Sequence, residues 1–139
     1  MNFTQRDRKL IEYATSFAYT SQHDITRVGA VIADGKSIVA CGINSHQSHP
    51  MQKRYNIYRN FRNDHTGATH HLHAEIAALI KVRWNDLSGM SIYVTRVLRD
   101  GSHGIARPCP ACMAALKDHK INKIYYTTAT GIAYEEINR

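Results

Sequence analysis

Two short stretches of the sequence bring together the residue types of a catalytic zinc site. The first, LHAEIAALIK, places His73 and Glu75 two residues apart at the start of a run that predicts a helix. The second, RPCPACMAAL, places Cys109 and Cys112 at the start of another such run. A catalytic zinc ion takes three protein ligands from His and Cys and keeps a fourth position for water. His73, Cys109 and Cys112 supply such a set.

The spacing within each stretch suits these roles. Cysteines three residues apart at a helix start can direct both sulfur atoms to one point, and the helix N-terminus stabilises their thiolate forms. Glu75 lies too close to His73 in the sequence to be a convenient second ligand from a helix, but it can reach the water and the substrate. A carboxylate there can take a proton from the water and pass it to a leaving amine. We therefore expect Glu75 to be the catalytic residue.

Other interpretations of the same residues stay open at this point. The Cys-x-x-Cys pair could be a redox motif, although such motifs follow the first strand and this pair comes late in the chain. It could also be half of a structural zinc site, but the third cysteine, Cys41, lies mid-strand and is typical of a small buried hydrophobe. His73 and Glu75, taken alone, could be ordinary first-turn residues of a helix. The four residues together favour the catalytic site.

Composition sets the frame for this site. The chain has 139 residues, enough for a single domain over residues 1–139, with 43% hydrophobic and 21% charged residues. No apolar run is long enough to span a bilayer, and the first ten residues lack the apolar core of a secretory signal. We expect a cytoplasmic protein without a membrane partner. The net charge of +7 indicates either an anionic partner or a solubilising surface charge.

Alternating helix and strand patterns predict the elements that position these residues. Apolar spacing and a possible Thr4 cap predict the first helix, and an Asp-Gly turn between two β-rich runs predicts a hairpin. The polar stretch that follows predicts a long loop with a short helix, and a second Asp-Gly predicts a small hairpin. These patterns predict an α/β sandwich with a mixed sheet. The expected helices are 4–19, 52–61, 72–84 and 110–120; the expected strands are 27–33, 37–43, 91–95 and 122–128, with a strand or helical turn at 131–137.

The chain resembles the cytidine and deoxycytidylate deaminase superfamily at these residues. His-x-Glu followed by Pro-Cys-x-x-Cys is the signature of zinc-dependent nucleobase deaminases. RVGAVIADGKSIVACGIN is similar to the opening hairpin of that family, and INKIYYTT to the strand after its second zinc helix. NSHQSHPMQKRY and the VTRV…RPC bridge are also similar to small deaminase-like proteins encoded by bacteriophages. The layout is nearer the deoxycytidylate and tRNA-adenosine deaminases than the small tetrameric cytidine deaminases.

This resemblance implies a three-layer α/β/α sandwich and a hydrolytic deaminase that is a homo-oligomer. Hydroxide held by one catalytic zinc would attack C4 of a cytosine nucleoside or nucleotide, with dCMP or deoxycytidine the expected substrate, while Glu75 shuttles protons. Asn44 and the backbone of Ala74 would hold base and sugar. Arg107 stands where many relatives have a Glu before Pro-Cys, and it is a candidate for binding phosphate together with Arg59, Arg62 and Arg96.

Two further points concern metal and partner. The insert after the hairpin has histidines but no cysteine, so we expect no second, structural zinc, the candidate ligands being His46, His49 and His70. Tyr55, Tyr58 and Phe61 alternate with basic residues, which allows an alternative: a cytosine or adenine deaminase acting on single-stranded DNA or RNA. Anchoring of these aromatic side chains to the core is the interpretation we favour. A non-enzymatic accessory subunit is a third hypothesis, against which the intact His, Glu and Cys set argues.

Overall fold

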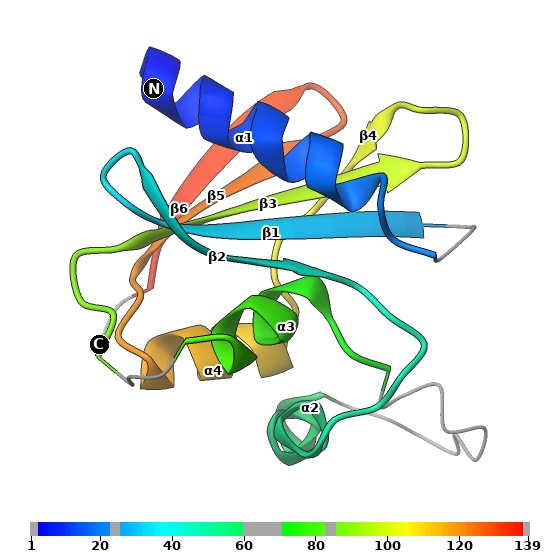
Figure 1. The fold of residues 1–139 in the computed structure, drawn as a ribbon, viewed down its shortest axis with the longest axis vertical. Helices are drawn as coiled ribbons and strands as arrows, with labels where there is room; N and C mark the ends of the chain where they lie inside the picture. The colour runs from blue at the N-terminus through cyan, green and yellow to red at the C-terminus, as the bar shows by residue number, and fades with distance from the viewer. Residues whose placement is uncertain (1–2, 23–25, 60–70, 83–85, 138–139) are drawn as a thin grey trace.

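A mixed β-sheet forms the centre of the fold in the computed structural model, which describes residues 3–22, 26–59, 71–82 and 86–137 (Figure 1). The strand order is β2-β1-β3-β5-β6, and the short β4 pairs with the end of β3. All neighbours are antiparallel except β3 and β5, which are parallel. The strands are β1 (Thr26–Asp34), β2 (Ser37–Ile43), β3 (Ser91–Leu98), β4 (His103–Gly104), β5 (Lys123–Thr128) and β6 (Gly131–Glu136).

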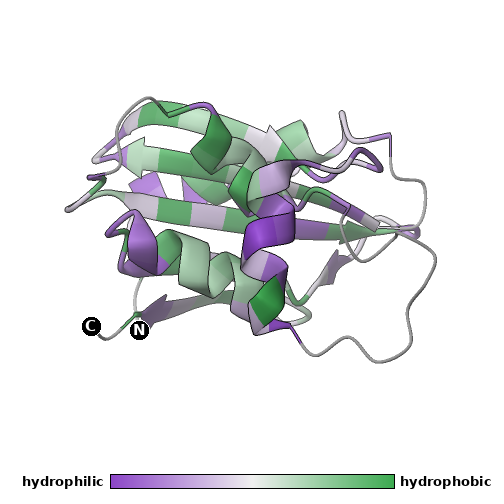
Figure 2. Cartoon of the chain, turned by 90° about the horizontal axis from the view of Figure 1, so that it is seen from below, coloured by the Kyte–Doolittle hydropathy of each residue, from purple (hydrophilic) through white to green (hydrophobic). Residues whose placement is uncertain are grey.

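Helices cover both faces of this sheet, which confirms the predicted α/β/α layers. Helix α1 (Gln5–Ala18) lies on one face, and α3 (Ala74–Ile80) and α4 (Pro110–Asp118) lie on the other (Figures 1 and 2). The short α2 (Pro50–Tyr55) and the 3-10 turn η1 (Asn56–Tyr58) pack against α4. Each face has its own buried apolar cluster, the larger one beneath α3 and α4. No helix in the described part of the chain is long and apolar enough to cross a membrane.

Several predicted boundaries shift in the structure. The helix expected over 72–84 ends at Ile80, which is 36% exposed. Strand β3 runs three residues past the expected end because Leu98 and its neighbours pair with β1 and β4. The second hairpin is confirmed as β3–β4, with Gly101 at a positive φ of 87°. The chain after Thr128 forms a strand, β6, and not a helical turn.

The start of α1 carries a buried charge. Thr4 caps the helix, as predicted: its hydroxyl accepts from Asp7 N at 3.1 Å, and Asp7 Oδ2 accepts from Thr4 N at 3.0 Å. The other oxygen of Asp7 accepts from the hydroxyl of Tyr93 on β3 at 2.7 Å. Burial acts to raise the pKa of Asp7, but the hydrogen bonds from Tyr93 and Thr4 outweigh it, so that the pKa lies below its ordinary value.

Asp7→Asn is expected to lower the free energy of unfolding at pH 7 by about 1–2 kcal/mol, because it weakens the helix cap and the Tyr93 bond. A carboxyl whose pKa is depressed by folding contributes stability above its unfolded pKa, and this contribution is lost as pH falls through the folded value. The difference in free energy of unfolding between wild type and variant should therefore narrow below about pH 4. Denaturant titrations between neutral and acidic pH measure it. A gap that stays constant would show that the charge of Asp7 does not stabilise the fold.

Candidate active site

His73, Cys109 and Cys112 meet at one point between the starts of α3 and α4. Nδ1 of His73 lies 3.5 Å from Sγ of Cys109 and 3.4 Å from Sγ of Cys112, and the three ligand atoms lie within 4.8 Å of one another. Zinc bonds of about 2.3 Å to sulfur and about 2.0–2.1 Å to nitrogen, at tetrahedral angles, separate the two atoms by about 3.5–3.6 Å. The donor set and its spacing therefore fit a zinc ion.

Both helices begin at a residue of this cluster. His73 is the N-cap of α3 and Cys109 the N-cap of α4, and each has an extended backbone and no side-chain capping bond. At an N-cap, the side-chain oxygen of a residue such as Ser or Asp accepts a hydrogen bond from the helix's own N–H groups. Here the side chains turn to the shared point instead. Pro110 at the first turn of α4 fits a position whose N–H would have no partner within the helix.

A buried glutamine from α2 supports His73. Gln52 is fully buried; its Oε1 accepts from His73 N at 2.9 Å, and its Nε2 donates to Oδ1 of Asn56 at 2.8 Å. This bond holds the backbone at the start of α3. The sequence analysis missed Gln52, because a glutamine in a polar segment is usually solvated. The only hint was a short predicted helix there.

Helix α3 is held against the sheet by a close approach at Gly42. A Cβ placed on Gly42 would lie 2.2 Å from Ala74 O and 2.4 Å from Ala78 N. Only a glycine allows the β2 backbone to reach α3 so closely. The start of α3, with His73 and Glu75, therefore has a fixed position relative to the hairpin.

The pKa values of the two cysteines are shifted in opposite directions. A hydrogen bond from Cys112, together with His73 nearby, lowers the pKa of Cys109 to about 4, although burial opposes this. The pKa of Cys112 lies well above its ordinary value, because its thiol bonds to Cys109 and is buried next to Glu75. A thiolate beside a buried thiol and an imidazole nitrogen is an environment that a cation stabilises, because metal binding takes the place of the protons.

Glu75 points into the same site. It is 5% exposed, and its burial raises its pKa while His73 opposes the shift. Burial acts to lower the pKa of His73, but Cys109 and Glu75 outweigh it and raise that pKa. Nε2 of His73, on the side away from the sulfurs, lies 3.2 Å from Nη1 of Arg59. A buried carboxylate with a raised pKa can hold and release a proton near neutral pH.

One cavity of about 360 Å³ opens over this cluster. All three residues expected to contact substrate, Asn44, Ala74 and Arg107, line it together with Glu75. The whole lining consists of Thr26, Val28, Asn44, Arg59, His73, Ala74, Glu75, Arg96, Ile105, Ala106, Arg107 and Cys109. Arg59, Arg96 and Arg107 make its polar wall basic. Arg62 lies outside the described residues.

Asn44 is held firmly in the cavity wall. Its Oδ1 accepts from Ser21 Oγ at 2.7 Å and from Val28 N at 3.0 Å, and its Nδ2 donates to Thr26 O at 2.9 Å. An amide group has two N–H donors, and among the described residues the second one has no partner. Asn44 thus ties the segment after α1 to β1 while keeping one donor for a ligand.

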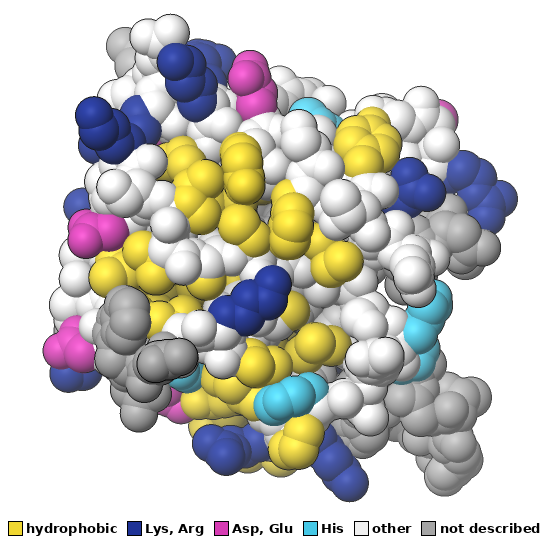
Figure 3. All heavy atoms as spheres, in the orientation of Figure 1, with side chains coloured by type: hydrophobic (Ala, Val, Ile, Leu, Met, Phe, Trp, Pro, Cys, Tyr) yellow, Lys and Arg dark blue, Asp and Glu magenta, His cyan; other side chains and the backbone are white. Residues whose placement is uncertain are grey.

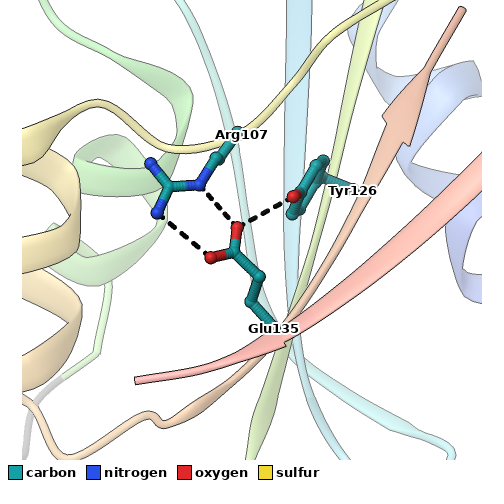
Figure 4. Close-up of polar contacts among 3 residues, drawn as sticks. All are labelled: Arg107, Tyr126 and Glu135. Carbon is teal, nitrogen blue, oxygen red and sulfur yellow. Dashed lines mark hydrogen bonds and ion pairs between the residues drawn. The ribbon is translucent and has the colours of Figure 1, made fainter. Parts of the chain in front are cut away.

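Arg107 is paired at the rim of the cavity. Its Nε donates to Oε2 of Glu135 at 2.6 Å and its Nη2 donates to Oε1 at 3.0 Å (Figure 4). Glu135 raises the pKa of Arg107, and Arg107 lowers the pKa of Glu135. The side chains are 52% and 32% exposed, so the pair contributes only about 0–1 kcal/mol to stability. The sequence analysis missed Glu135.

The aromatic and basic segment after β2 has a mixed placement. Tyr55 is buried and donates to Asp118 Oδ2 at 2.7 Å, so it anchors α2 to α4. Tyr58 is exposed, and its ring lies 6.5 Å from that of Tyr55. Phe61 lies outside the described residues. On the face in Figure 3, Lys and Arg side chains lie around the edge and also near the middle, and they do not form one patch.

A single group of metal-ligand type occurs within the described residues, the one formed by His73, Cys109 and Cys112. His46 packs edge-on against His71, with ring centroids 5.2 Å apart, and Nδ1 of His49 caps α2 by accepting from Met51 N. His70 lies outside the part that the structure describes. The expectation of one zinc ion therefore rests on this centre alone.

Comparison with known proteins agrees with the geometry. Residues 4–128 match the family model described as the cytidine and deoxycytidylate deaminase zinc-binding region. No curated protein sequence gives a significant match.

Solved structures of such deaminases share the fold. The dCMP deaminase of cyanophage S-TIM5, in apo form, is 21% identical over 91% of this chain and 86% of its own, with a TM-score of 0.58. In its complex with dCMP and dUMP, it is 22% identical over 90% and 83%, with a TM-score of 0.55. The cytidine deaminase of Burkholderia pseudomallei is 17% identical over 96% and 93%, with a TM-score of 0.65. At these identities the likeness shows the fold.

Proposed function

The chain belongs to the cytidine and deoxycytidylate deaminase zinc-binding family, and from this premise we propose that it hydrolyses the amino group of a cytosine nucleotide, with dCMP as the best candidate. One observation carries the proposal: a single cavity of about 360 Å³ joins the His73 and Cys109 centre to Glu75 and to three arginines. Its size is at the lower end for small-molecule sites.

Zinc held by His73, Cys109 and Cys112 would supply the water-activating chemistry, lowering the pKa of water toward neutrality. The chain's own residues do the rest. Glu75 takes a proton from the attacking water and delivers it to N3 of the cytosine ring as the bond from C4 to oxygen forms. It then takes the second proton, from the new hydroxyl on C4, and delivers it to the amino group, which leaves as ammonia when the C4–N bond breaks. Its raised pKa suits a group that must both accept and donate near neutral pH.

The substrate is held by the cavity wall. The first N–H groups of a helix lack partners within the helix, so Ala74 offers its backbone N–H to the base. Asn44 offers its second amide N–H to the sugar. Arg59, Arg96 and Arg107 give the rim a positive field, which favours a monophosphate over an uncharged nucleoside.

Ammonia release from zinc-loaded protein tests the proposal with dCMP, deoxycytidine, CMP, cytidine and a cytosine-containing single-stranded oligonucleotide. We expect kcat/KM for dCMP to exceed that for deoxycytidine by about 10- to 100-fold, the effect of one charge-assisted bond. Turnover of deoxycytidine equal to that of dCMP would remove the arginines from substrate binding. Turnover of the oligonucleotide alone would replace the proposal by the polynucleotide alternative. The buried Tyr55 argues against that alternative, because its ring has almost no exposed surface on which a base could stack.

Two further expectations remain predictions. The resemblance implies a homo-oligomer, which light scattering coupled to size-exclusion chromatography measures directly. The organisation as one domain over residues 1–139 predicts a single cooperative unfolding transition of the zinc-loaded protein.

A further inference from the structure

Arg107 is held by two residues from the last two strands of the sheet. Two of its nitrogens donate to the two oxygens of Glu135, and Oε2 of Glu135 also accepts from the hydroxyl of Tyr126 at 2.8 Å (Figure 4). Such a two-point contact fixes the plane of a guanidinium as well as its position. The bond from Tyr126 in turn fixes the carboxylate of Glu135, so both residues together set the orientation of Arg107.

We call Glu135 and Tyr126, the two residues that hold Arg107, the clamp. The sheet register places this clamp on the face that carries the cavity. In the antiparallel pair of β5 and β6, Tyr126 lies opposite Ala133, and Glu135 lies two residues further along the same face. Diagonal neighbours at this spacing are within reach of long side chains. Tyr126 and Ala133 pack into the cluster beneath α3 and α4, whereas the rings of Tyr125 and Tyr134 meet on the other face. Glu135 therefore lies on the α3 and α4 side.

The loop that carries Arg107 is bound to the same strand. Ala106 N donates to Thr127 O at 2.9 Å, and the hydroxyl of Thr127 donates to Gly104 O at 3.0 Å. The loop backbone therefore cannot drift relative to β5, and the side chain starts from a fixed point next to Glu135.

The clamp uses only one edge of the guanidinium. Glu135 takes Nε and Nη2, and the nitrogen without a dashed line in Figure 4 points away from Glu135 and Tyr126. Arg107 lines the cavity together with Arg59 and Arg96. Because both partners of the ion pair are partly exposed, the pair adds little to stability, and its geometry points to a role in orientation.

We infer that Glu135 and Tyr126 are positioning residues that hold Arg107 with its remaining N–H groups ready for the 5′-phosphate of the nucleotide substrate. The inference rests on the proposed function and adds the residues that set its preference for a monophosphate. Glu135 could instead compete with the phosphate for Arg107. The two accounts predict opposite effects of removing the Glu135 charge on phosphate binding. Loss of orientation weakens phosphate binding, whereas loss of a competing charge strengthens it.

Glu135→Gln tests this directly, because glutamine keeps the shape but cannot accept both bonds of the fork. We expect KM for dCMP to rise by about 10-fold with little change in kcat, while kcat/KM for deoxycytidine stays at the wild-type value. Tyr126→Phe removes only the outer bond, so the same change should be smaller, about threefold. Glu136→Gln is the matched control, because Glu136 is the next residue on β6, is exposed and bonds to Tyr134.

A double variant shows whether Glu135 acts through Arg107. In an Arg107→Ala background, Glu135→Gln should have no further effect on kcat/KM for dCMP. A full additive loss in that background would overturn the inference. So would either of two results for the single variant Glu135→Gln: a fall in KM for dCMP, or an unchanged ratio of kcat/KM for dCMP to kcat/KM for deoxycytidine.

The proposed function fails separately, if wild-type protein deaminates neither compound. Calorimetric titration with dCMP and deoxycytidine still decides the inference in that case. Weaker binding of dCMP to Glu135→Gln than to wild type supports it, and equal or tighter binding overturns it.

Discussion

Glu75→Gln is expected to lower kcat by about 10²- to 10⁴-fold, the range of a lost general acid–base catalyst. Glutamine has almost the same shape as Glu75 but cannot accept a proton at neutral pH. The carboxylate is buried in the cavity next to Cys112, so water has no other base of that kind beside it among the described residues. The zinc content of the variant should remain at the wild-type value, because His73 and both cysteines are intact.

The matched control is Glu12→Gln, the same change on the exposed face of α1. It should leave both turnover and zinc content unchanged. Zinc content is measured by elemental analysis of dialysed protein, and turnover by ammonia release. A Glu75→Gln variant that keeps zinc and retains more than about a tenth of the wild-type kcat would remove Glu75 from the proton-transfer role.

Cys112→Ser should remove zinc from the protein. Loss of a residue that merely orients a ligand costs about 10- to 100-fold in metal affinity, and loss of a ligand should cost more than that. Cys112 lies on α4 and is fully buried in the larger apolar cluster. A ligand from solvent therefore cannot take the place of its sulfur. Competition with a chromophoric chelator measures the affinity, and turnover should fall in parallel.

The third cysteine provides the control for this change. Cys41 is half-buried on β2, away from the centre, and Cys41→Ser should bind zinc as the wild type does. Equal zinc affinity in Cys112→Ser and wild type would contradict the metal centre described here. A loss of zinc in both variants would instead show that the thiols act through folding and not through direct ligation.

Much of this arrangement could be predicted from the sequence, because the signals were local. The Thr4 cap, the Asp-Gly turns and the Pro110 start each leave a mark within four residues. The zinc centre was also predictable, although its ligands lie 36 and 39 residues apart. His, Cys and Glu at helix starts are rarely explained by packing, so their joint presence indicated chemistry.

What could not be predicted depends on pairings between distant side chains. Arg107 and Glu135 lie 28 residues apart, and their contact requires the register of β5 with β6, which no local pattern specifies. Gln52 supports His73 from across the site, and it looks like any polar residue in the sequence. The end of α3 at Ile80 also had no local stop signal, since Lys81 and Val82 continue a helical composition.

The most direct test of the central claim is conversion of dCMP by the zinc-loaded protein in water enriched in the heavy oxygen isotope. Hydrolytic deamination replaces the amino group on C4 by oxygen from water. The account predicts that mass spectrometry finds dUMP with one heavy oxygen on its base, released with one equivalent of ammonia. Protein that carries a full complement of zinc and leaves both dCMP and deoxycytidine unchanged would contradict it.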